Sequence, residues 1–363
     1  MTDRNSMSAS SRSTSHATDA GVAPRIDSLR TLADRGGLVW GSGSVKASLS
    51  TADERPANYF TDPRYGRTLA HQFNSLSPEN EFKFDMVQPE EGVFDFDGLD
   101  RLLQFAEAHQ MQFKAHSGIS RAFNPPWLAA KENAASFRAA LVTHFETIMQ
   151  RYTGRMDRWD IVTEPFAPLG GEGLERNLFY ERLGSGYIAE AFRIAHDADP
   201  TARLFFNENL TEYYPAKRRE MYELVSSMVA DGVPVHGIAL QMHETIHAPA
   251  AGELTAIVRE YRELGLEVTI AELDVHTLDD HSQAQIYRDV LQEALDAGIR
   301  DISVWGFTDR HLYTWLPGAK PTLFDEQFEP KPAYFAVHDV LQAFANRLGM
   351  PTERRNGEID SLG

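Results

Sequence analysis

Eight short apolar segments alternate with helical patterns along this chain, and that alternation limits the possible folds more than any other feature. The segments are rich in β-branched and aromatic residues, while the stretches between them repeat apolar residues at a spacing of three to four. No linker rich in Pro, Gly or Ser interrupts the series between residues 26 and 348. Strands that alternate with helices in one uninterrupted unit predict an α/β fold, a single (β/α)8 TIM barrel. The predicted strands are Gly37–Gly43, Phe73–Ser77, Gln112–His116, Arg158–Glu164, Ala202–Asn207, Val235–Gln241, Leu266–Glu272 and Ile302–Gly306.

The two ends of the chain lie outside the predicted barrel, which we place at residues 27–348. Residues 1–26 are rich in Ser, Thr, Ala and charge and lack the apolar segment of a signal peptide, so we expect a disordered tail. Residues 349–363 are polar and predict a second, frayed tail. The direct expectation is a cytoplasmic protein, and secretion is the alternative if a native leader is missing from this sequence.

The charge balance narrows the possible partners. The chain has 53 acidic and 35 basic residues among 363, a formal net charge of −18, which disfavours a nucleic-acid backbone or an anionic membrane surface as partner. A neutral or cationic ligand fits this charge better. The absence of cysteine excludes disulfides, thiolate metal sites and a cysteine nucleophile. No stretch is long and apolar enough to span a bilayer.

Polar side chains stand at the C-terminal ends of the predicted strands, where TIM barrels carry their chemistry. Their occurrence at strand after strand is more informative than any single residue. In chain order they are Glu79, Asn80, His116, Glu164, Asn207, Gln241, His243, Glu272, Trp305 and Asp309.

Two of these strand ends carry a glutamate in the same setting. Glu164 ends a buried β-rich run and is followed by a proline, and Glu272 ends a second such run. Cleavage of a glycosidic bond needs one carboxyl that is protonated and one that is ionised, and the two lie about 5 Å apart in a retaining enzyme. A single glutamate in this position is more often a helix cap or an ion-pair partner. Two of them within a ring of amides, imidazoles and tryptophans predict a retaining glycosidase.

The remaining polar and aromatic candidates could also have purely structural roles. His116 and His243 could be core histidines or metal ligands, but their spacing matches no local zinc motif, so hydrogen bonds to sugar hydroxyls or to a nucleophile suit them better. Trp305 and Trp315 could be core residues, although tryptophan faces commonly stack on sugar rings. The polar cluster Glu79, Asn80 and Lys83 could be a solvated helix start; its density favours substrate contact.

These residues give the sequence a resemblance to glycoside hydrolase family 10, the β-1,4-xylanase family, over nearly the whole predicted barrel. Glu79-Asn-Glu-Phe-Lys83 is similar to the family's Glu-Asn-x-x-Lys segment, Trp159–Glu164 to the acid/base strand, and Ala271-Glu272-Leu-Asp274 to the nucleophile strand. Further similar segments are Pro89–Phe96, Gly237–His243, Val304–Asp309, Pro321–Asp325 and Pro330–Tyr334.

The resemblance implies roles for the predicted site residues. Glu164 would be the general acid/base, and Glu272 the nucleophile that forms a covalent glycosyl-enzyme. His243 would also hydrogen-bond Glu272 and help to keep it ionised. No metal and no cofactor are implied. The residues implied to line the glycone subsites are Glu79, Asn80, Lys83, His116, Gln241, His243, Trp305 and Trp315.

Four positions depart from the family pattern. Thr163 stands where the family has an asparagine that binds the 2-hydroxyl of the sugar in the −1 subsite, a contact that strengthens in the transition state. Ser120 replaces a tryptophan of that subsite, Arg121 a histidine, and Phe84 another tryptophan. We therefore expect retained chemistry on an altered substrate, such as a sugar modified at the 2-position or a small glycoside.

Two alternatives stay open at the level of the sequence. One is a tailoring deglycosylase or transglycosidase of a specialised metabolite, with an apolar acceptor region built from Phe123, Pro125, Pro126 and Trp127, which could equally be packing residues. The other is a sugar-binding relic that has lost the reaction. We predict a monomer that hydrolyses a small soluble glycoside or xylo-oligosaccharide.

Overall fold

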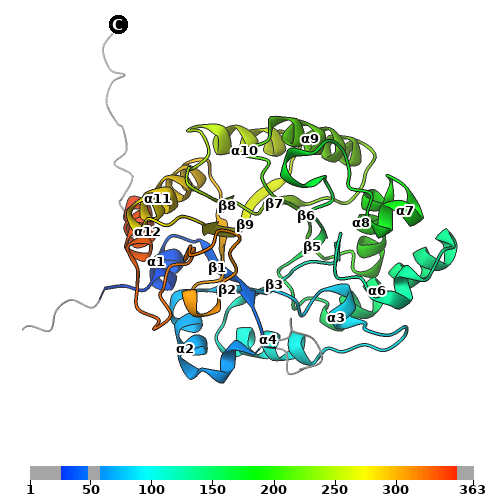
Figure 1. Ribbon diagram of the computed structural model, residues 1–363, viewed down its shortest axis with the longest axis horizontal. Coiled ribbons are helices and arrows are strands. Elements are labelled where there is room, and N and C mark those ends of the chain that lie inside the picture. Colours follow the sequence, from blue (N-terminus) through cyan, green and yellow to red (C-terminus); the bar gives the residue numbers. More distant parts are fainter. Residues whose placement is uncertain (1–25, 48–57, 350–363) are drawn as a thin grey trace, which may run out of the picture.

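The computed structural model describes residues 26–47 and 58–349, and these form a closed parallel barrel (Figure 1). Each strand pairs in parallel with the next, and the last strand pairs with the first. This confirms the predicted TIM barrel. In order around the barrel the strands are β1 (Val39–Val45), β2 (Ser75–Pro78), β3 (Gln112–Ala115), β5 (Arg158–Thr163), β6 (Leu204–Glu208), β7 (Gly237–Leu240), β9 (Glu267–Val275) and β10 (Asp301–Trp305).

A ring of helices surrounds the strands (Figure 1). The predicted tails at residues 1–26 and 349–363 lie almost entirely outside the described residues. None of the helices in the described part of the chain combines the length and the apolar character that a membrane span requires. The longer helices are α1 (Leu29–Arg35), α2 (Pro63–Gln72), α4 (Asp97–Ala108), α6 (Ala134–Tyr152), α8 (Tyr187–Ala198), α9 (Pro215–Ala230), α10 (Glu253–Glu263), α11 (Asp280–Asp296) and α12 (Pro332–Gly349), and shorter ones are α3 (Phe84–Val87), α5 (Pro126–Ala129) and α7 (Leu178–Leu183).

Local side-chain chemistry fixes where several helices begin. The side chain of Asn133 accepts hydrogen bonds from the backbone of Ala135 and Ser136 at the start of α6. Asp279 does the same for Ser282 at the start of α11. These caps satisfy backbone N–H groups that have no partner within the helix.

All eight strands end one to three residues away from their predicted ends, and two of these differences concern the candidate site. The predicted seventh strand ended at Glu272, but β9 continues to Val275, because the short strand β8 (His243–Glu244) pairs with Asp274 and Val275 and extends the ladder. The fourth strand, β5, ends one residue early at Thr163. Glu164 has a φ of 51°, so the chain leaves the strand there. A second short strand, β4 (Ile119–Ser120), pairs with β5.

Charged side chains fill part of the barrel interior below the strand ends. Lys114 donates a hydrogen bond to Asp301, and a guanidinium nitrogen of Arg158 lies 3.2 Å from the other oxygen of Asp301. The Nε of Arg158 is 3.5 Å from Asp160 on the same strand. All four are buried, and buried charges persist only when they are paired in this way. This charged network lies in the barrel interior directly below the strand-end residues.

Candidate active site

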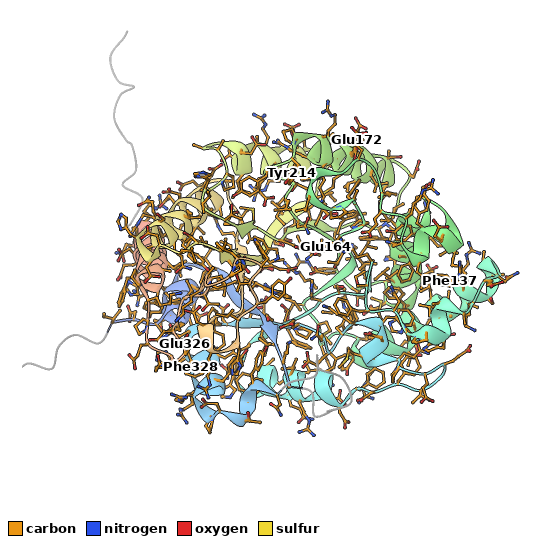
Figure 2. The ribbon with its side chains drawn as sticks, viewed as in Figure 1. Phe137, Glu164, Glu172, Tyr214, Glu326 and Phe328 are labelled. Atoms are coloured by element: carbon orange, nitrogen blue, oxygen red, sulfur yellow. The ribbon has the colours of Figure 1, made fainter. Side chains whose placement is uncertain are left out.

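The two glutamates lie at the same end of the barrel, on strands that are held in register by the intervening β6 and β7. The backbone N–H of Glu164 donates to the carbonyl of Asn207 (3.1 Å), and the N–H of Glu272 donates to the carbonyl of Gln241 (3.1 Å). Figure 2 shows Glu164 inside the ring formed by the barrel. Parallel register therefore brings the four strand ends to one level.

Two amide side chains connect the carboxylates. Nε2 of Gln241 donates to Oε1 of Glu164 (3.0 Å) and to Oδ1 of Asn207 (2.9 Å). Nδ2 of Asn207 donates in turn to Oε1 of Glu272 (3.0 Å) and to Asp160 (3.2 Å). These hydrogen bonds form a continuous path, Glu164–Gln241–Asn207–Glu272. The path fixes the two carboxyl groups relative to each other and, through Asp160, to the charged network in the barrel interior.

The two carboxyl groups have different surroundings. The side chain of Glu272 is 5% exposed, whereas that of Glu164 is 27% exposed. Nε2 of His116 lies 3.7 Å from Oε1 of Glu272, and Nε2 of His243 lies 3.4 Å from Oε2. Burial alone would raise the pKa of Glu272, but the two imidazoles and the Asn207 hydrogen bond more than offset it, so this pKa lies below its ordinary value. Glu272 is therefore held ionised.

Both imidazoles are oriented by a further carboxylate. Nδ1 of His116 is 3.1 Å from Asp160, and Nδ1 of His243 is 2.9 Å from Asp274. Burial acts to lower the pKa of His243, but the charges of Asp274 and Glu272 outweigh it, and this pKa lies well above its ordinary value. His243 is thus a cation that faces Glu272 on one side and Asp274 on the other.

His243, Asp274 and His276 are close enough together to suggest metal ligands. Both imidazoles, however, contact the same oxygen of Asp274, at 2.9 and 3.0 Å, and Nδ1 of His276 contacts the hydroxyl of Thr314 at 2.9 Å. A histidine that binds a metal must give up the proton that the raised pKa of His243 retains. Hydrogen bonding accounts for this cluster, and the prediction of no metal stays a prediction.

We expect His243→Gln to move the acidic limb of the kcat/KM profile to higher pH. Loss of the imidazolium removes a charge that lowers the pKa of Glu272, so this carboxyl takes up a proton at a higher pH than in the unchanged protein. Below the limb kcat/KM falls about tenfold per pH unit. Profiles measured on one aryl glycoside test this.

His276→Gln is the matched control for that profile, because His276 contacts Asp274 and not Glu272. Its acidic limb should move less than that of His243→Gln. An unchanged limb in His243→Gln, with folding verified by circular dichroism, would contradict the electrostatic role of His243.

Two tryptophans of the predicted set stand beside this cluster. The ring of Trp305 at the end of β10 lies 5.4 Å from that of His116, between centroids, and 6.3 Å from that of His243. Trp315 stacks on His276 with 3.6 Å between ring centroids, and the residue is 46% exposed. A Cβ at Gly43 would come within 2.6 Å of the Trp305 ring, so the glycine of the first strand makes room for this indole.

The predicted group Glu79, Asn80 and Lys83 lies after β2, at the same end of the barrel. Glu79 accepts a hydrogen bond from Ser44 and pairs with Lys46 (2.7 Å), both on the segment that contains Gly43. Asn80 is buried, and Nζ of Lys83 lies 3.7 Å above the ring of Phe123.

Thr163 and Ser120 occupy neighbouring strand ends, since they are paired in register between β4 and β5. Thr163 is buried, and its hydroxyl has no hydrogen-bond partner within the described part of the chain. Buried hydroxyls without partners are uncommon in folded proteins. This group is therefore available to a bound molecule.

A cleft of about 810 Å³ opens beside Glu164. Four residues of the predicted set line this cleft: Glu164, Gln241, His243 and Trp315. Arg121 enters it, with Nε 3.5 Å from Oε2 of Glu164. Residues that the sequence reasoning did not select form much of the remaining wall: Pro168, Leu169, Asn209, Leu210, Tyr213, Tyr214, Thr245 and Tyr313.

The apolar acceptor region considered from the sequence is not part of this cleft wall. Phe123 lies under Lys83, and Trp127 donates its N–H to the carbonyl of Gln88 (3.0 Å) and packs near Phe84. These contacts agree with the alternative that Phe123 and Trp127 are packing residues. Apolar side chains of the cleft wall come instead from the loops after β5 and β6.

The sequence reasoning gave no role to three residues that organise the glutamates. Asn207 links them, Asp160 orients His116, and Asp274 orients His243. The signal for Asn207 was its place among the polar strand ends. Asp160 and Asp274 lie within strands, where their alternation with apolar neighbours indicates that they face the barrel interior.

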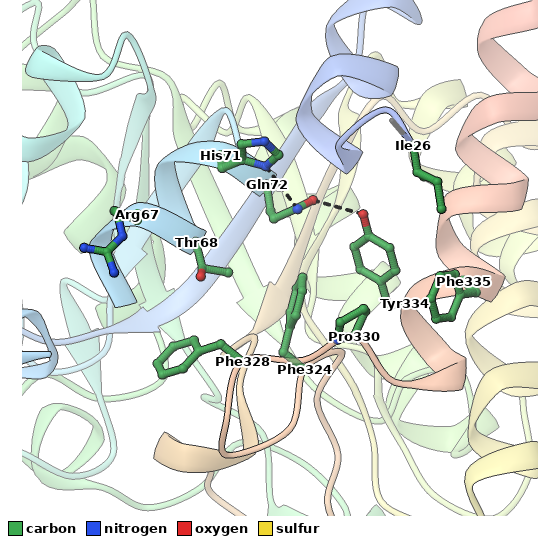
Figure 3. A pocket seen from close by; sticks show the side chains of 10 residues that line it. All are labelled: Ile26, Arg67, Thr68, His71, Gln72, Phe324, Phe328, Pro330, Tyr334 and Phe335. Atoms are coloured by element: carbon green, nitrogen blue, oxygen red, sulfur yellow. Dashed lines mark hydrogen bonds between the residues drawn. The ribbon is translucent and has the colours of Figure 1, made fainter. Parts of the chain in front are cut away.

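A second hollow, of about 470 Å³, lies outside the barrel between α2 and α12 (Figure 3). Figure 3 shows the Tyr334 hydroxyl donating to Gln72 at 3.4 Å on one side of it. None of the predicted site residues lines this hollow.

Comparisons with known proteins agree with this geometry. Residues 43–340 match the pattern of glycosyl hydrolase family 10. An endo-1,4-beta-xylanase of Geobacillus stearothermophilus is 34% identical over 304 residues, which cover 75% of this chain and 90% of that protein. Endo-1,4-beta-xylanase B of Thermotoga neapolitana is 30% identical over 293 residues, covering 77% and 84%.

Solved structures give the same result. Native xylanase 10B from Thermotoga maritima superposes with a TM-score of 0.80 at 30% identity, over 88% of this chain and 99% of that one. Xylanase 10B from Thermotoga petrophila in complex with xylobiose gives a TM-score of 0.79 at 30% identity, over 88% and 98%. This chain therefore belongs to glycosyl hydrolase family 10, a family of retaining glycosidases.

Proposed function

We propose that this protein hydrolyses β-1,4-xylosidic bonds or closely related β-glycosidic bonds with retention of configuration, with Glu164 as general acid/base and Glu272 as nucleophile. The observation that carries the proposal is the path Glu164–Gln241–Asn207–Glu272, which joins one buried, ionised carboxylate to one that faces an open cleft. Retaining hydrolysis needs two carboxyl groups with these separate tasks.

The proposed reaction has two steps. In the first, a carboxylate oxygen of Glu272 attacks the anomeric carbon while Glu164 gives a proton to the departing oxygen, so the glycosidic bond is replaced by an ester. In the second, Glu164 takes a proton from water, which attacks the anomeric carbon and releases Glu272. His116 and His243 stabilise the carboxylate that leaves, and Trp305 and Trp315 offer faces to the sugar.

The −1 subsite is where we expect the substrate to differ from unmodified xylan. The hydroxyl of Thr163 is shorter than an asparagine amide, and Ser120 beside it leaves room where the family has a tryptophan. A sugar with a modified 2-position would fit this pair. A small soluble glycoside is the substrate form that we propose.

Thr163→Asn should raise kcat/KM on a substrate with a free 2-hydroxyl by about tenfold, because an amide adds a charge-stabilising hydrogen bond in the transition state. The matched 2-deoxy substrate should gain nothing. Aryl xylosides with and without the 2-hydroxyl measure both. Equal effects on the two substrates would contradict the assignment of Thr163 to the 2-position.

The proposed function is tested by following xylo-oligosaccharides and aryl β-xylosides by proton NMR. Retention gives the β-anomer as the first product, before mutarotation. The α-anomer as first product, or a lack of turnover on all β-glycosides tried, would overturn the proposal.

A second candidate is a transglycosidase or deglycosylase of a specialised metabolite. The apolar and aromatic side chains of Leu169, Leu210 and Tyr214 beside Glu164 favour it, since an apolar acceptor would rest on them. Products formed in the presence of alcohols or phenols distinguish transfer from hydrolysis. A monomeric state and a cytoplasmic location stay predictions.

A further inference from the structure

Arg121 is the strand-end residue whose contacts the proposed hydrolysis does not use. It follows Ser120 of β4 and points into the cleft beside Glu164. Its Nε lies 3.5 Å from Glu164, and its Nη1 lies 3.6 Å from Glu175. Both are ion pairs beyond ordinary hydrogen-bond length, and within the described residues the guanidinium donates no hydrogen bond.

The guanidinium is held in place from both sides. The backbone N–H of Glu175 donates to the carbonyl of Pro165 (2.8 Å), which ties the Glu175 segment to the residue after Glu164. The Arg121 side chain is 40% exposed, and the cleft provides the open volume in front of it. Arg121 thus presents a planar set of N–H donors to the cleft, the arrangement that recognises a carboxylate with two hydrogen bonds.

The first step of hydrolysis leaves the positive charge of Arg121 less neutralised by its neighbours. Glu164 must hold a proton when the bond breaks, and a protonated Glu164 no longer offsets the charge of Arg121. Glu175 is then its single anionic neighbour among its described contacts, at 3.6 Å. A carboxylate on the substrate would compensate the guanidinium at that stage.

Resting on the proposed function, we propose that Arg121 selects glycosides that carry a carboxylate next to the bond that is cleaved. The carboxylate belongs either to a uronic acid unit or to an acidic leaving group, and both present the same planar anion. Glu164 marks the leaving-group oxygen, so the anion lies on the side of the cleft where Arg121 and Glu175 meet. The net charge of −18 makes a specific cation necessary for an anionic substrate.

Matched substrate pairs test this selection. One pair is a xylo-oligosaccharide with and without a glucuronic acid branch, and the other is a nitrophenyl xyloside with and without a carboxylate on the phenyl ring. The measured quantity is the ratio of kcat/KM for the acidic over the neutral member. In Arg121→Gln this ratio should fall about 10- to 100-fold, since a charge-assisted pair is lost. Arg121→Lys should recover part of it, because an ammonium keeps the charge without the planar fork.

The control for overall charge is Arg138→Gln, which removes an arginine that pairs with Glu190 on the outer helices α6 and α8. Its ratio should equal that of the unchanged protein. The substrate pair whose ratio falls in Arg121→Gln identifies whether the sugar or the leaving group carries the anion. Equal ratios in Arg121→Gln and the unchanged protein for both pairs would overturn the inference.

Binding separates this inference from the proposed function. Calorimetry with Glu272→Ala measures the affinity for the branched and unbranched oligosaccharides without turnover. Adding Arg121→Gln should weaken the branched ligand about 10- to 100-fold more than the unbranched one, if the anion is on the sugar. Lack of turnover together with this affinity difference would reject the hydrolysis and keep the recognition of the anion. Turnover without any effect of Arg121→Gln, on rates or affinity, would reject the recognition and keep the hydrolysis.

Discussion

Glu272→Ala should lower kcat on every β-glycoside substrate by about 10⁴-fold or more, because it removes the atom that forms the covalent intermediate. The residue is buried among His116, His243 and Asn207. A loss of the nucleophile affects the first step whatever the leaving group is. Aryl xylosides with leaving groups of different pKa should therefore all lose activity.

Azide provides the decisive control. A small anion that enters the space vacated by the Glu272 carboxylate attacks the anomeric carbon directly and gives an α-glycosyl azide from a β-glycoside. Glu267→Ala, at the opposite end of β9 and paired with Arg203 at the surface, is the matched variant and should keep its kcat. Residual kcat within about tenfold of the unchanged protein in Glu272→Ala would show that another group is the nucleophile.

The barrel itself could be predicted because its signals are local. A strand such as Arg158–Thr163 is rich in aromatic and β-branched residues, and a helix such as α6 repeats apolar residues at helical spacing. Eight such strands can close only in a few ways, and parallel pairing fixes which ends carry the chemistry. The end of β9 was misplaced because the pairing that extends it comes from β8, a two-residue strand too short to leave a pattern of its own.

The site was predictable in its residues more than in its contacts. Strand ends place Glu164, Gln241 and Glu272 together, since they share one edge of the sheet. The link through Asn207 depends on which way two amides point across four strand ends, and no sequence period encodes that. The same holds for Asp274, which is recognisable as an inward-facing residue but not as the partner of His243.

The cleft wall was the least predictable part. Leu210, Tyr213 and Tyr214 lie in the loop after β6, and loops lack the periodicity that assigns a side chain to a face. The direction of Arg121 depended likewise on the position of Glu175, more than fifty residues along the chain. Long-range ion pairs of this kind become visible only when the loops are placed in space.

Glu164→Gln should show a different pattern from the loss of Glu272, because it removes a proton donor and leaves the nucleophile. With xylo-oligosaccharides, whose leaving group needs a proton, kcat should fall about 10²- to 10⁴-fold. With a dinitrophenyl xyloside the first step needs no proton, so the glycosyl-enzyme should form readily and then accumulate, because water lacks its general base. A burst of dinitrophenol followed by slow turnover is the expected time course.

Azide also tests the role of Glu164, and the expected product has the opposite anomeric configuration to that from Glu272→Ala. It should attack the accumulated glycosyl-enzyme of Glu164→Gln without needing a general base and give a β-glycosyl azide, since two inversions retain the configuration. Glu175→Gln alters the other carboxyl that faces Arg121 but leaves Glu164 in place, so any loss there should be the same for good and poor leaving groups. A loss in Glu164→Gln that does not depend on the leaving group would mean that Glu164 positions the substrate and that the proton comes from elsewhere.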